Sequence, residues 1–218
     1  MIDCAPGRCI YSSGDRINRK YKVLKKLGEG TFGTVYKVQD LDGQDYALKL
    51  LKLWEVNPGD REILIKRFDM EFETGRIKSN YLVHSYSHDQ VEGNPYIIME
   101  FCPNGDLRSM NNLSCHRLAS VSSNILYGLH DLHQCGKIHR DLKPDNVLIT
   151  NNDINAKICG KLTDFGTCRN ISERNRINKE LTQGIGTPTY MAPEVLGQKK
   201  YKKPADIYSF SITMYEIF

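Results

Sequence analysis

Residues 139–146 read His-Arg-Asp-Leu-Lys-Pro-Asp-Asn, and the apolar residues Val-Leu-Ile follow at 147–149. A carboxylate, an ammonium group and a carboxamide stand at Asp141, Lys143 and Asn146, in front of what the apolar run predicts to be a short buried strand. This combination suits transfer of a phosphoryl group from a nucleotide. The carboxylate can orient a hydroxyl nucleophile and accept its proton, the lysine can neutralise charge on the moving group, and the asparagine oxygen can hold a magnesium ion.

The composition is that of an ordinary globular protein. The 218 residues suffice for one large domain or two small lobes, and 40% of them are apolar and 26% charged. The net charge of +4 is too mild to predict nucleic-acid binding. The seven cysteines form no C-x-x-C pair, which favours reduced thiols over a zinc or redox motif. The sequence contains no apolar run of membrane-spanning length and no signal-peptide core, so we expect a cytoplasmic chain without a transmembrane segment.

The first 20 residues predict a basic flexible tail. Proline, glycine and serine residues break any hydrophobic periodicity there, and Arg16, Arg19 and Lys20 make its end basic. Two interpretations stay open: a juxtamembrane segment, or simply solvated chain.

A glycine-rich turn follows the first predicted strand, residues 21–27. Residues 28–35 read Gly-Glu-Gly-Thr-Phe-Gly-Thr-Val, and glycine lets backbone N–H groups approach phosphates closely because it has no Cβ. A lone G-x-G-x-x-G is weak evidence, since it also marks dinucleotide-binding folds, in which a helix follows. Here residues 34–38 alternate and are rich in β-branched side chains, which predicts a second strand and therefore a hairpin over a nucleotide.

The next predicted strand, residues 45–51, holds a lysine among apolar residues. Burial of an unpaired ammonium group is unfavourable, so on structural grounds alone Lys49 belongs at a sheet edge. A helix is predicted over residues 61–78 from the spacing of its apolar side chains, although Gly75 lies inside it and weakens it.

Further elements follow in the second half of the chain. Residues 81–87 and 95–101 predict two strands, with a Glu-Gly-Asn turn at 92–94 between them. A helix is predicted over residues 115–135, with Gly136 as its C-cap. After a polar loop at 150–160 and a short strand, the sequence reads Asp-Phe-Gly at 164–166.

Asp164 and Asn146 together offer hard oxygen ligands of the kind that Mg²⁺ prefers. The alternative is purely structural: Asn146 turns the loop and Asp164 caps a turn.

These motifs, in this order, resemble those of the eukaryotic protein kinase domain of the serine/threonine or tyrosine-kinase-like type. Residues 139–146 resemble its catalytic loop, residues 28–35 its glycine-rich loop, and residues 186–194 the segment that closes its activation loop. The resemblance implies an α+β, two-lobed fold over residues 21–218. A small antiparallel β lobe with one helix spans about 21–101, a hinge about 102–106, and a mainly helical, incomplete large lobe about 107–218.

The resemblance also implies which residues bind ATP between the lobes. The glycine-rich loop covers the phosphates through Leu27, Gly28, Glu29, Gly30, Thr31, Phe32, Gly33, Thr34 and Val35. Lys49 grips the α- and β-phosphates and pairs with a helix glutamate, for which Glu71 is the first choice and Glu73 the alternative. The alternative interpretation is that Glu71 and Glu73 are both solvated acids on the surface of the helix. The remaining nucleotide contacts are Ala47, Met99, Leu148, backbone groups of Glu100 and Cys102, and Asp106, which either reaches the ribose or caps the following helix.

The same resemblance assigns the chemistry. Asp141 orients the substrate hydroxyl, Lys143 steadies the transferred group, and Asn146 and Asp164 hold Mg²⁺. The Lys143–Thr187 pair implies serine and threonine, rather than tyrosine, as acceptors in protein substrates.

Regulation is also implied. Arg140, beside the catalytic aspartate, implies control by phosphorylation of the activation loop. The candidate acceptors are Ser172, Thr182 and Thr189.

Two other hypotheses stay open. One is a non-catalytic pseudokinase or binding module, which loss of Lys49, Asp141 or Asp164 would favour, although the chain has all three. The other is a truncated fragment that folds poorly. Residues 207–218 carry apolar side chains on every side of a predicted helix, and such a helix needs partners all round it. In the family, later helices supply those partners and an arginine for the glutamate that matches Glu194. We therefore expect the chain alone either to aggregate or to bind ATP weakly with little turnover, as an incomplete gene product or domain fragment would. Its oligomeric state is not predicted.

Overall fold

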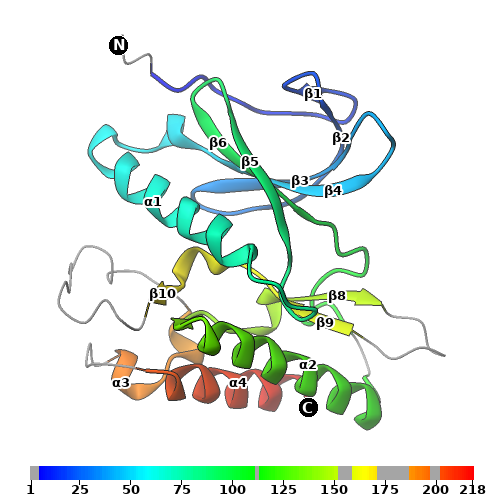
Figure 1. The fold of residues 1–218 in the computed structure, drawn as a ribbon, viewed down its shortest axis with the longest axis vertical. Helices are drawn as coiled ribbons and strands as arrows, with labels where there is room; N and C mark the ends of the chain where they lie inside the picture. The colour runs from blue at the N-terminus through cyan, green and yellow to red at the C-terminus, as the bar shows by residue number, and fades with distance from the viewer. Residues whose placement is uncertain (1–4, 111–112, 152–158, 171–186, 197–201) are drawn as a thin grey trace. The chain divides into compact units, whose positions relative to one another are not determined.

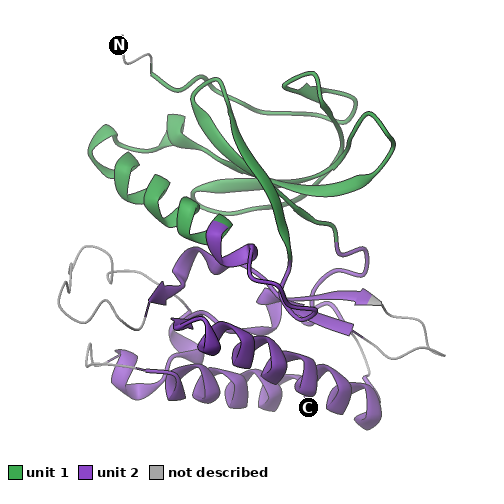
Figure 2. Ribbon diagram, viewed as in Figure 1, with its two compact units in different colours: residues 1–72, 84–101 green, residues 73–83, 102–218 purple. Residues whose placement is uncertain are grey.

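The computed structural model describes residues 5–110, 113–151, 159–170, 187–196 and 202–218 (Figure 1). The chain divides into two compact units (Figure 2). Unit 1 comprises Met1–Phe72 and His84–Phe101, and unit 2 comprises Glu73–Val83 and Cys102–Phe218. No helix in the described part of the chain is both long enough and apolar enough to cross a membrane.

Unit 1 is built on a curled antiparallel sheet with the strand order β1-β2-β3-β4-β6-β5. Its strands are β1 (Arg16–Ile17), β2 (Tyr21–Glu29), β3 (Gly33–Gln39), β4 (Asp45–Leu51), β5 (Ser85–Val91) and β6 (Asn94–Glu100). Successive side chains of a strand point to opposite faces. One face therefore buries Tyr36, Leu48 and Ile98 in the core of the unit, whereas Val35 and Lys49, which are register partners, lie on the other face.

The hairpin predicted around the glycine-rich turn is confirmed. Strand β2 pairs with β3 up to Glu29 and Thr34, and the Gly30 amide donates a hydrogen bond to the Gly33 carbonyl (2.8 Å). A strand therefore follows the glycines, which excludes the dinucleotide-binding arrangement.

Three details of the predicted elements were wrong. Strand β4 pairs with β3 on one side and β6 on the other, so Lys49 does not lie at a sheet edge. The helix α1 spans Pro58–Gly75, after the short 3₁₀ turn Leu53–Glu55, so Gly75 ends the helix instead of interrupting it. Strand β5 begins at Ser85 and not at residue 81.

The N-terminal segment also differs from the predicted solvated tail. Cys9 and Ile17 are buried in the core of unit 1, and β1 pairs with β2. The Gly7 amide donates to the Glu92 carbonyl (2.9 Å). The segment packs because its few apolar side chains cover the core face of the sheet, a long-range contact that local composition does not reveal.

Unit 2 is organised around two long helices, α2 (Cys115–Gln134) and α4 (Pro204–Ile217). Ser114 caps the start of α2, and Gly136, at φ 69°, follows its end. The predicted apolar face of α2 is confirmed, since it is buried in one core with β8 and β9. The smaller elements are β7 (Lys137–Ile138), β8 (Val147–Asn151), β9 (Cys159–Leu162), β10 (Arg169–Asn170), α3 (Pro193–Leu196), and the 3₁₀ turns Pro144–Asn146, Phe165–Thr167 and Pro188–Tyr190.

Residues 73–83 belong to unit 2, although the sequence assigned them to the small lobe. The Val83 amide donates to the Leu162 carbonyl (2.9 Å), and the Leu162 amide donates to the Tyr81 carbonyl (2.8 Å). The Ser79 hydroxyl bonds Asp131 of α2 (2.5 Å), and Tyr81 stacks on Tyr127.

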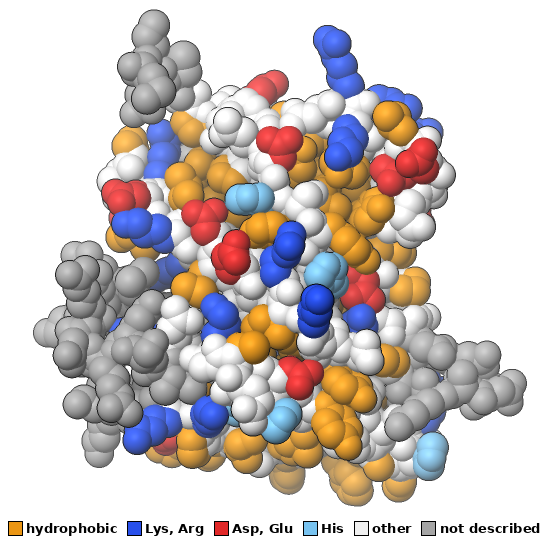
Figure 3. All heavy atoms as spheres, viewed as in Figure 1, with side chains coloured by type: hydrophobic (Ala, Val, Ile, Leu, Met, Phe, Trp, Pro, Cys, Tyr) orange, Lys and Arg blue, Asp and Glu red, His pale blue; other side chains and the backbone are white. Residues whose placement is uncertain are grey.

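Helix α4 buries its small and polar side chains and exposes several of its large apolar ones. Ala205, Asp206, Ser209 and Thr213 are buried, whereas Ile207, Tyr208 and Tyr215 are exposed, as is Phe218 just after the helix. Figure 3 shows hydrophobic side chains gathered at the end of unit 2 where α4 lies.

Gly128 lies where helix α2 packs closely against Tyr81 and Leu162 of unit 2. A Cβ at this position would lie 2.9 Å from the Tyr81 carbonyl oxygen and 3.0 Å from Leu162 Cδ1. We expect Gly128→Ala to destabilise the chain by about 1–3 kcal/mol, because backbone cannot yield as a side chain can. Thermal melting measures the effect, with Ser123→Ala, on the exposed side of the same helix, as the control. Equal melting temperatures for the parent and Gly128→Ala would contradict this packing.

Candidate active site

Residues 139–146 of unit 2, the candidate catalytic loop, are anchored by a buried carboxylate. Asp206, in the first turn of α4, is 1% exposed. It accepts hydrogen bonds from the backbone amides of His139 and Arg140, both at 2.9 Å. His133 Nε2 lies 2.8 Å from the same carboxylate. This anchor fixes the residues immediately before Asp141. Sequence reasoning missed this role; the available signal was an aspartate in the first turn of a largely apolar helix.

The Asp141 carboxylate is 7% exposed and held on both oxygens. Its Oδ1 accepts the backbone N–H of Thr187 (2.8 Å), and its Oδ2 accepts from Asn146 Nδ2 (3.2 Å). Lys143 Nζ lies 3.3 Å from Oδ2 and donates to the Thr187 hydroxyl at 2.8 Å. A carboxylate, an ammonium group and a hydroxyl thus meet at one point, an arrangement suited to general-base chemistry on a hydroxyl.

The two predicted metal ligands are joined through the backbone. The Thr163 amide, next to Asp164, donates to the Asn146 carbonyl (3.0 Å). Asn146 turns its amide nitrogen toward the Asp141 carbonyl oxygen (2.7 Å), which directs its Oδ1 elsewhere. Asp164 adopts a left-handed conformation with φ 60°, which for a residue other than glycine often marks a functional constraint.

These two residues fit a hard divalent cation. Such an ion takes oxygen ligands, and Mg²⁺ usually keeps waters and substrate phosphates beside one or two protein ligands. No group of three or more His, Cys, Asp or Glu residues capable of holding a metal occurs in the described ranges.

The predicted phosphorylation sites are only partly described. Ser172 and Thr182 lie outside the described residues, and Thr189 is an exposed residue of the 3₁₀ turn Pro188–Tyr190. Arg140 has φ 75° and donates its amide to Asp206.

In unit 1, the sheet face opposite the core collects the predicted adenine and phosphate residues. Val35 is the register partner of Lys49, and Ala47 is the register partner of Met99. The Lys49 ammonium lies 2.6 and 2.8 Å from the carboxylate oxygens of Glu71, which is 4% exposed. The structure therefore pairs Lys49 with Glu71, and Glu73 is exposed.

The glycine-rich loop leaves open space at two of its three glycines. A Cβ at Gly28 would meet nothing within 4 Å, and a Cβ at Gly30 only the Gly33 carbonyl at 3.9 Å. Gly33 is different, since its Cβ would lie 3.0 Å from the Leu50 carbonyl of β4. Leu27, Glu29, Thr31 and Phe32 are exposed, whereas Thr34 is buried and points to the core face.

Lys52 ties this loop to the end of β4, a contact that the sequence did not suggest. The Lys52 amide donates to the Phe32 carbonyl (2.8 Å), and its ammonium lies 3.1 Å from Glu29 Oε1 and 2.8 Å from Glu55 Oε2.

The residues around the predicted hinge have local partners. The Glu100 amide donates to the His84 carbonyl (2.9 Å), just before β5, so this amide already has a partner within unit 1. In unit 2, Cys102 is buried. Asp106 Oδ1 accepts the Ser109 amide (2.8 Å), and Asp106 forms a β-bridge with Leu148. Asp106 therefore caps a turn and not a helix, since α2 begins at Cys115.

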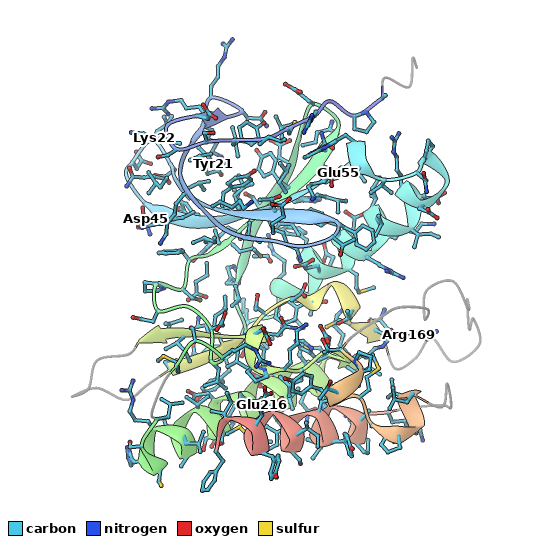
Figure 4. All side chains as sticks on the ribbon, turned by 180° about the vertical axis from the view of Figure 1, so that it is seen from behind. Tyr21, Lys22, Asp45, Glu55, Arg169 and Glu216 are labelled. Atoms are coloured by element: carbon cyan, nitrogen blue, oxygen red, sulfur yellow. The ribbon has the colours of Figure 1, made fainter. Side chains whose placement is uncertain are left out.

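Arg108 forms a second network that sequence reasoning missed. Its guanidinium bonds Asp145 of the catalytic loop (2.9 Å), Glu216 of α4 (2.7 Å) and the Tyr190 hydroxyl (2.6 Å). Tyr190 also donates its hydroxyl to Glu216, which Figure 4 labels on α4. The network joins the candidate catalytic loop to the 3₁₀ turn that follows Thr187.

The sequence also matches known proteins. The family model described as protein kinase domain matches residues 21–218. The serine/threonine-protein kinase STE20 of Candida glabrata is 34% identical over 212 residues, which are 95% of this chain and 22% of that protein. Serine/threonine-protein kinase 4 homolog A of Dictyostelium discoideum is 35% identical over 90% of this chain and 41% of its own length. The human serine/threonine-protein kinase MRCK gamma is 30% identical over 90% of this chain and 13% of its own length. The chain thus spans about a fifth of the STE20 relative.

The Arg108 network predicts a pH effect on stability. Hydrogen bonds from Arg108, and secondarily from Tyr190, hold the pKa of Glu216 below its ordinary value of 4.5. A carboxyl group whose pKa is lower in the folded state stabilises the fold above its unfolded pKa, and this contribution is lost as pH falls through the folded pKa. Both side chains are more than a third exposed, so the contribution is at most about 1 kcal/mol.

We therefore expect the parent chain to melt roughly 2–4 °C above Glu216→Gln near neutral pH. The difference should shrink once the pH falls below 4.5. Melting curves of both proteins across pH 3–7 measure it, and a difference that widens on acidification would contradict the role given to Glu216.

Proposed function

Because the chain belongs to the protein kinase domain family, we propose that it transfers the γ-phosphoryl group of ATP to serine or threonine hydroxyls of proteins. The observation that carries the proposal is the Asp141 carboxylate, which is fixed by Thr187 and Asn146 and stands beside the Lys143 ammonium. Relatives named as serine/threonine-protein kinases, 34–35% identical over nearly the whole chain, support the same conclusion.

In this proposal Asp141 orients the acceptor hydroxyl and takes its proton as the oxygen attacks the γ-phosphorus. Lys143 neutralises charge on the transferred group. Since its ammonium bonds the Thr187 hydroxyl at 2.8 Å, it also fixes the segment along which a substrate peptide would lie. The Lys143–Thr187 contact at the base favours short aliphatic hydroxyls over the longer tyrosine side chain.

We assign the nucleotide contacts of each unit separately, from the types of residue that it carries. In unit 1, Lys49, held by Glu71, would bind the α- and β-phosphates, with the glycine-rich loop over them. Val35, Ala47 and Met99 would contact the adenine. In unit 2, Asn146 and Asp164 would hold Mg²⁺, which when bound neutralises charge on the β- and γ-phosphates.

We place this activity in the cytoplasm, where ATP and reduced thiols are both available. The six described cysteines carry reduced thiols: Cys9, Cys102, Cys115, Cys135, Cys159 and Cys168.

The proposal is tested by phosphotransfer from labelled ATP to mixed protein substrates, followed by phosphoamino-acid analysis. We expect phosphoserine and phosphothreonine. In Asp141→Asn, turnover should fall by about 100-fold or more, because the base is lost. Its nucleotide affinity should stay near that of the parent, because Asp141 faces the acceptor.

Three results would overturn the proposal. They are mostly phosphotyrosine product, undiminished turnover in Asp141→Asn, and nucleotide binding by the parent without any transfer. The last would instead identify a binding module.

A further inference from the structure

Asn94, the first residue of β6, is a polar side chain of unit 1 that is fully buried, at 0% exposure. Its Nδ2 lies 2.8 Å from the Gly7 carbonyl oxygen and 3.1 Å from that of Glu92. Its Oδ1 accepts the backbone N–H of Leu53 at 3.1 Å. One carboxamide thus joins three segments that are distant in sequence: the N-terminal segment, the β5–β6 turn, and the connection from β4 to α1.

The connection that Asn94 holds carries two parts of the proposed nucleotide site. The Leu53 amide bonds Asn94, and the Leu53 carbonyl accepts from Arg61 Nε of α1 at 3.2 Å. The preceding residue, Lys52, bonds the Phe32 carbonyl of the glycine-rich loop through its own amide. Of these two consecutive residues, Lys52 therefore contacts the glycine-rich loop, and Leu53 contacts α1, the helix that carries Glu71.

Residues 6–9, which we call the N-terminal strap, fit closely against the β5–β6 turn. The Gly7 amide donates to the Glu92 carbonyl (2.9 Å), and a Cβ on Gly7 would collide with the Glu92 side chain. A Cβ on Gly93 would lie 3.4 Å from Pro6 Cα. Cys9 is 4% exposed, with its sulfur 3.5 Å from Asn94 Nδ2.

A simpler explanation is that Asn94 only closes the β5–β6 turn. Its contacts with the carbonyl oxygens of Val91 (3.4 Å) and Glu92 (3.1 Å) serve that purpose. The bonds to Leu53 and Gly7 do not, since neither residue belongs to the turn. A buried carboxamide whose donor and acceptor are both used in this way is difficult to replace.

We propose that Asn94 is a positioning residue for the nucleotide site of unit 1, and that the N-terminal strap keeps it in place. Through Leu53 and Lys52 it sets the position of the glycine-rich loop and of α1. The effect on activity rests on the proposed kinase function, whereas the effect on the Leu53 connection does not.

Hydrogen–deuterium exchange on the full chain tests the structural part. In Asn94→Ala, the Leu53 amide loses its acceptor, so we expect about tenfold faster exchange there. Faster exchange should extend to the glycine-rich loop and the first turns of α1. Gly7→Val displaces the strap at a half-buried surface position and should produce the same pattern more weakly, even if Asn94→Ala fails to fold.

Asn18→Gly is the matched control. Asn18 also bonds the sheet from the N-terminal segment, through the Gln90 carbonyl (2.9 Å) and the Tyr96 hydroxyl (3.1 Å). It does not touch the Leu53 connection, and glycine accepts its φ of 48° without strain. Exchange at Leu53 should stay at the parent rate in this variant.

Steady-state kinetics tests the functional part. For Asn94→Ala we expect KM for ATP to rise by about tenfold while kcat changes by less than about twofold, because the acceptor side of the reaction lies in unit 2.

Unchanged exchange at Leu53 in both Asn94→Ala and Gly7→Val would overturn the proposal. Faster exchange in Asn94→Ala alone would overturn the role of the strap, and a kcat loss without a KM change would overturn the link to the nucleotide. A parent chain without transferase activity would defeat the proposed function and leave the exchange result standing.

Discussion

The conformation of the candidate catalytic loop depends on one buried carboxylate. Asp206 accepts the adjacent amides of His139 and Arg140, and Arg140 takes a left-handed φ of 75° that a residue other than glycine adopts only where its surroundings enforce it. The two hydrogen bonds impose this conformation and so fix the orientation of the next residue, Asp141. The sequence pattern of α4 suggests only a core helix. Through Asp206, however, this helix holds the loop that carries the proposed catalytic residue Asp141.

In both units, hydrogen bonds to two consecutive backbone amides fix the main chain beside residues of the proposed site. In unit 2 a buried acid holds two consecutive backbone amides before the proposed base. In unit 1 the consecutive amides of Lys52 and Leu53 bond the Phe32 carbonyl and the Asn94 side chain. Both arrangements fix the backbone, so main-chain hydrogen bonds determine the positions of side chains with a proposed function, such as Asp141. Fixed groups of this kind need little reorganisation when charge moves during a reaction.

Sequence reasoning succeeded where the signal is local. The glycine hairpin and the apolar face of α2 follow from short patterns, and the family resemblance directed attention to Asp141 and Asn146. It failed where the partner is remote. The strand pattern alone assigned Lys49 to a sheet edge, because Glu71, 22 residues away, is invisible to strand propensity, and only the family resemblance indicated Glu71 as its partner. The bond between Arg108 and Glu216 spans 108 residues, and the buried N-terminal segment depends on a sheet that its own composition does not reveal.

The most direct test of this account replaces the anchor itself. In Asp206→Asn, one carboxylate oxygen becomes an N–H₂ group that faces a donor, so we expect exchange at the His139 or Arg140 amide to accelerate by about tenfold or more. Phosphotransfer should fall in parallel while the chain stays folded. Asp131→Asn, which alters a carboxylate of α2 bonded to Ser79, serves as the control and should change neither quantity. Parent-like exchange at His139 and Arg140, together with parent-like phosphotransfer in Asp206→Asn, would contradict the account.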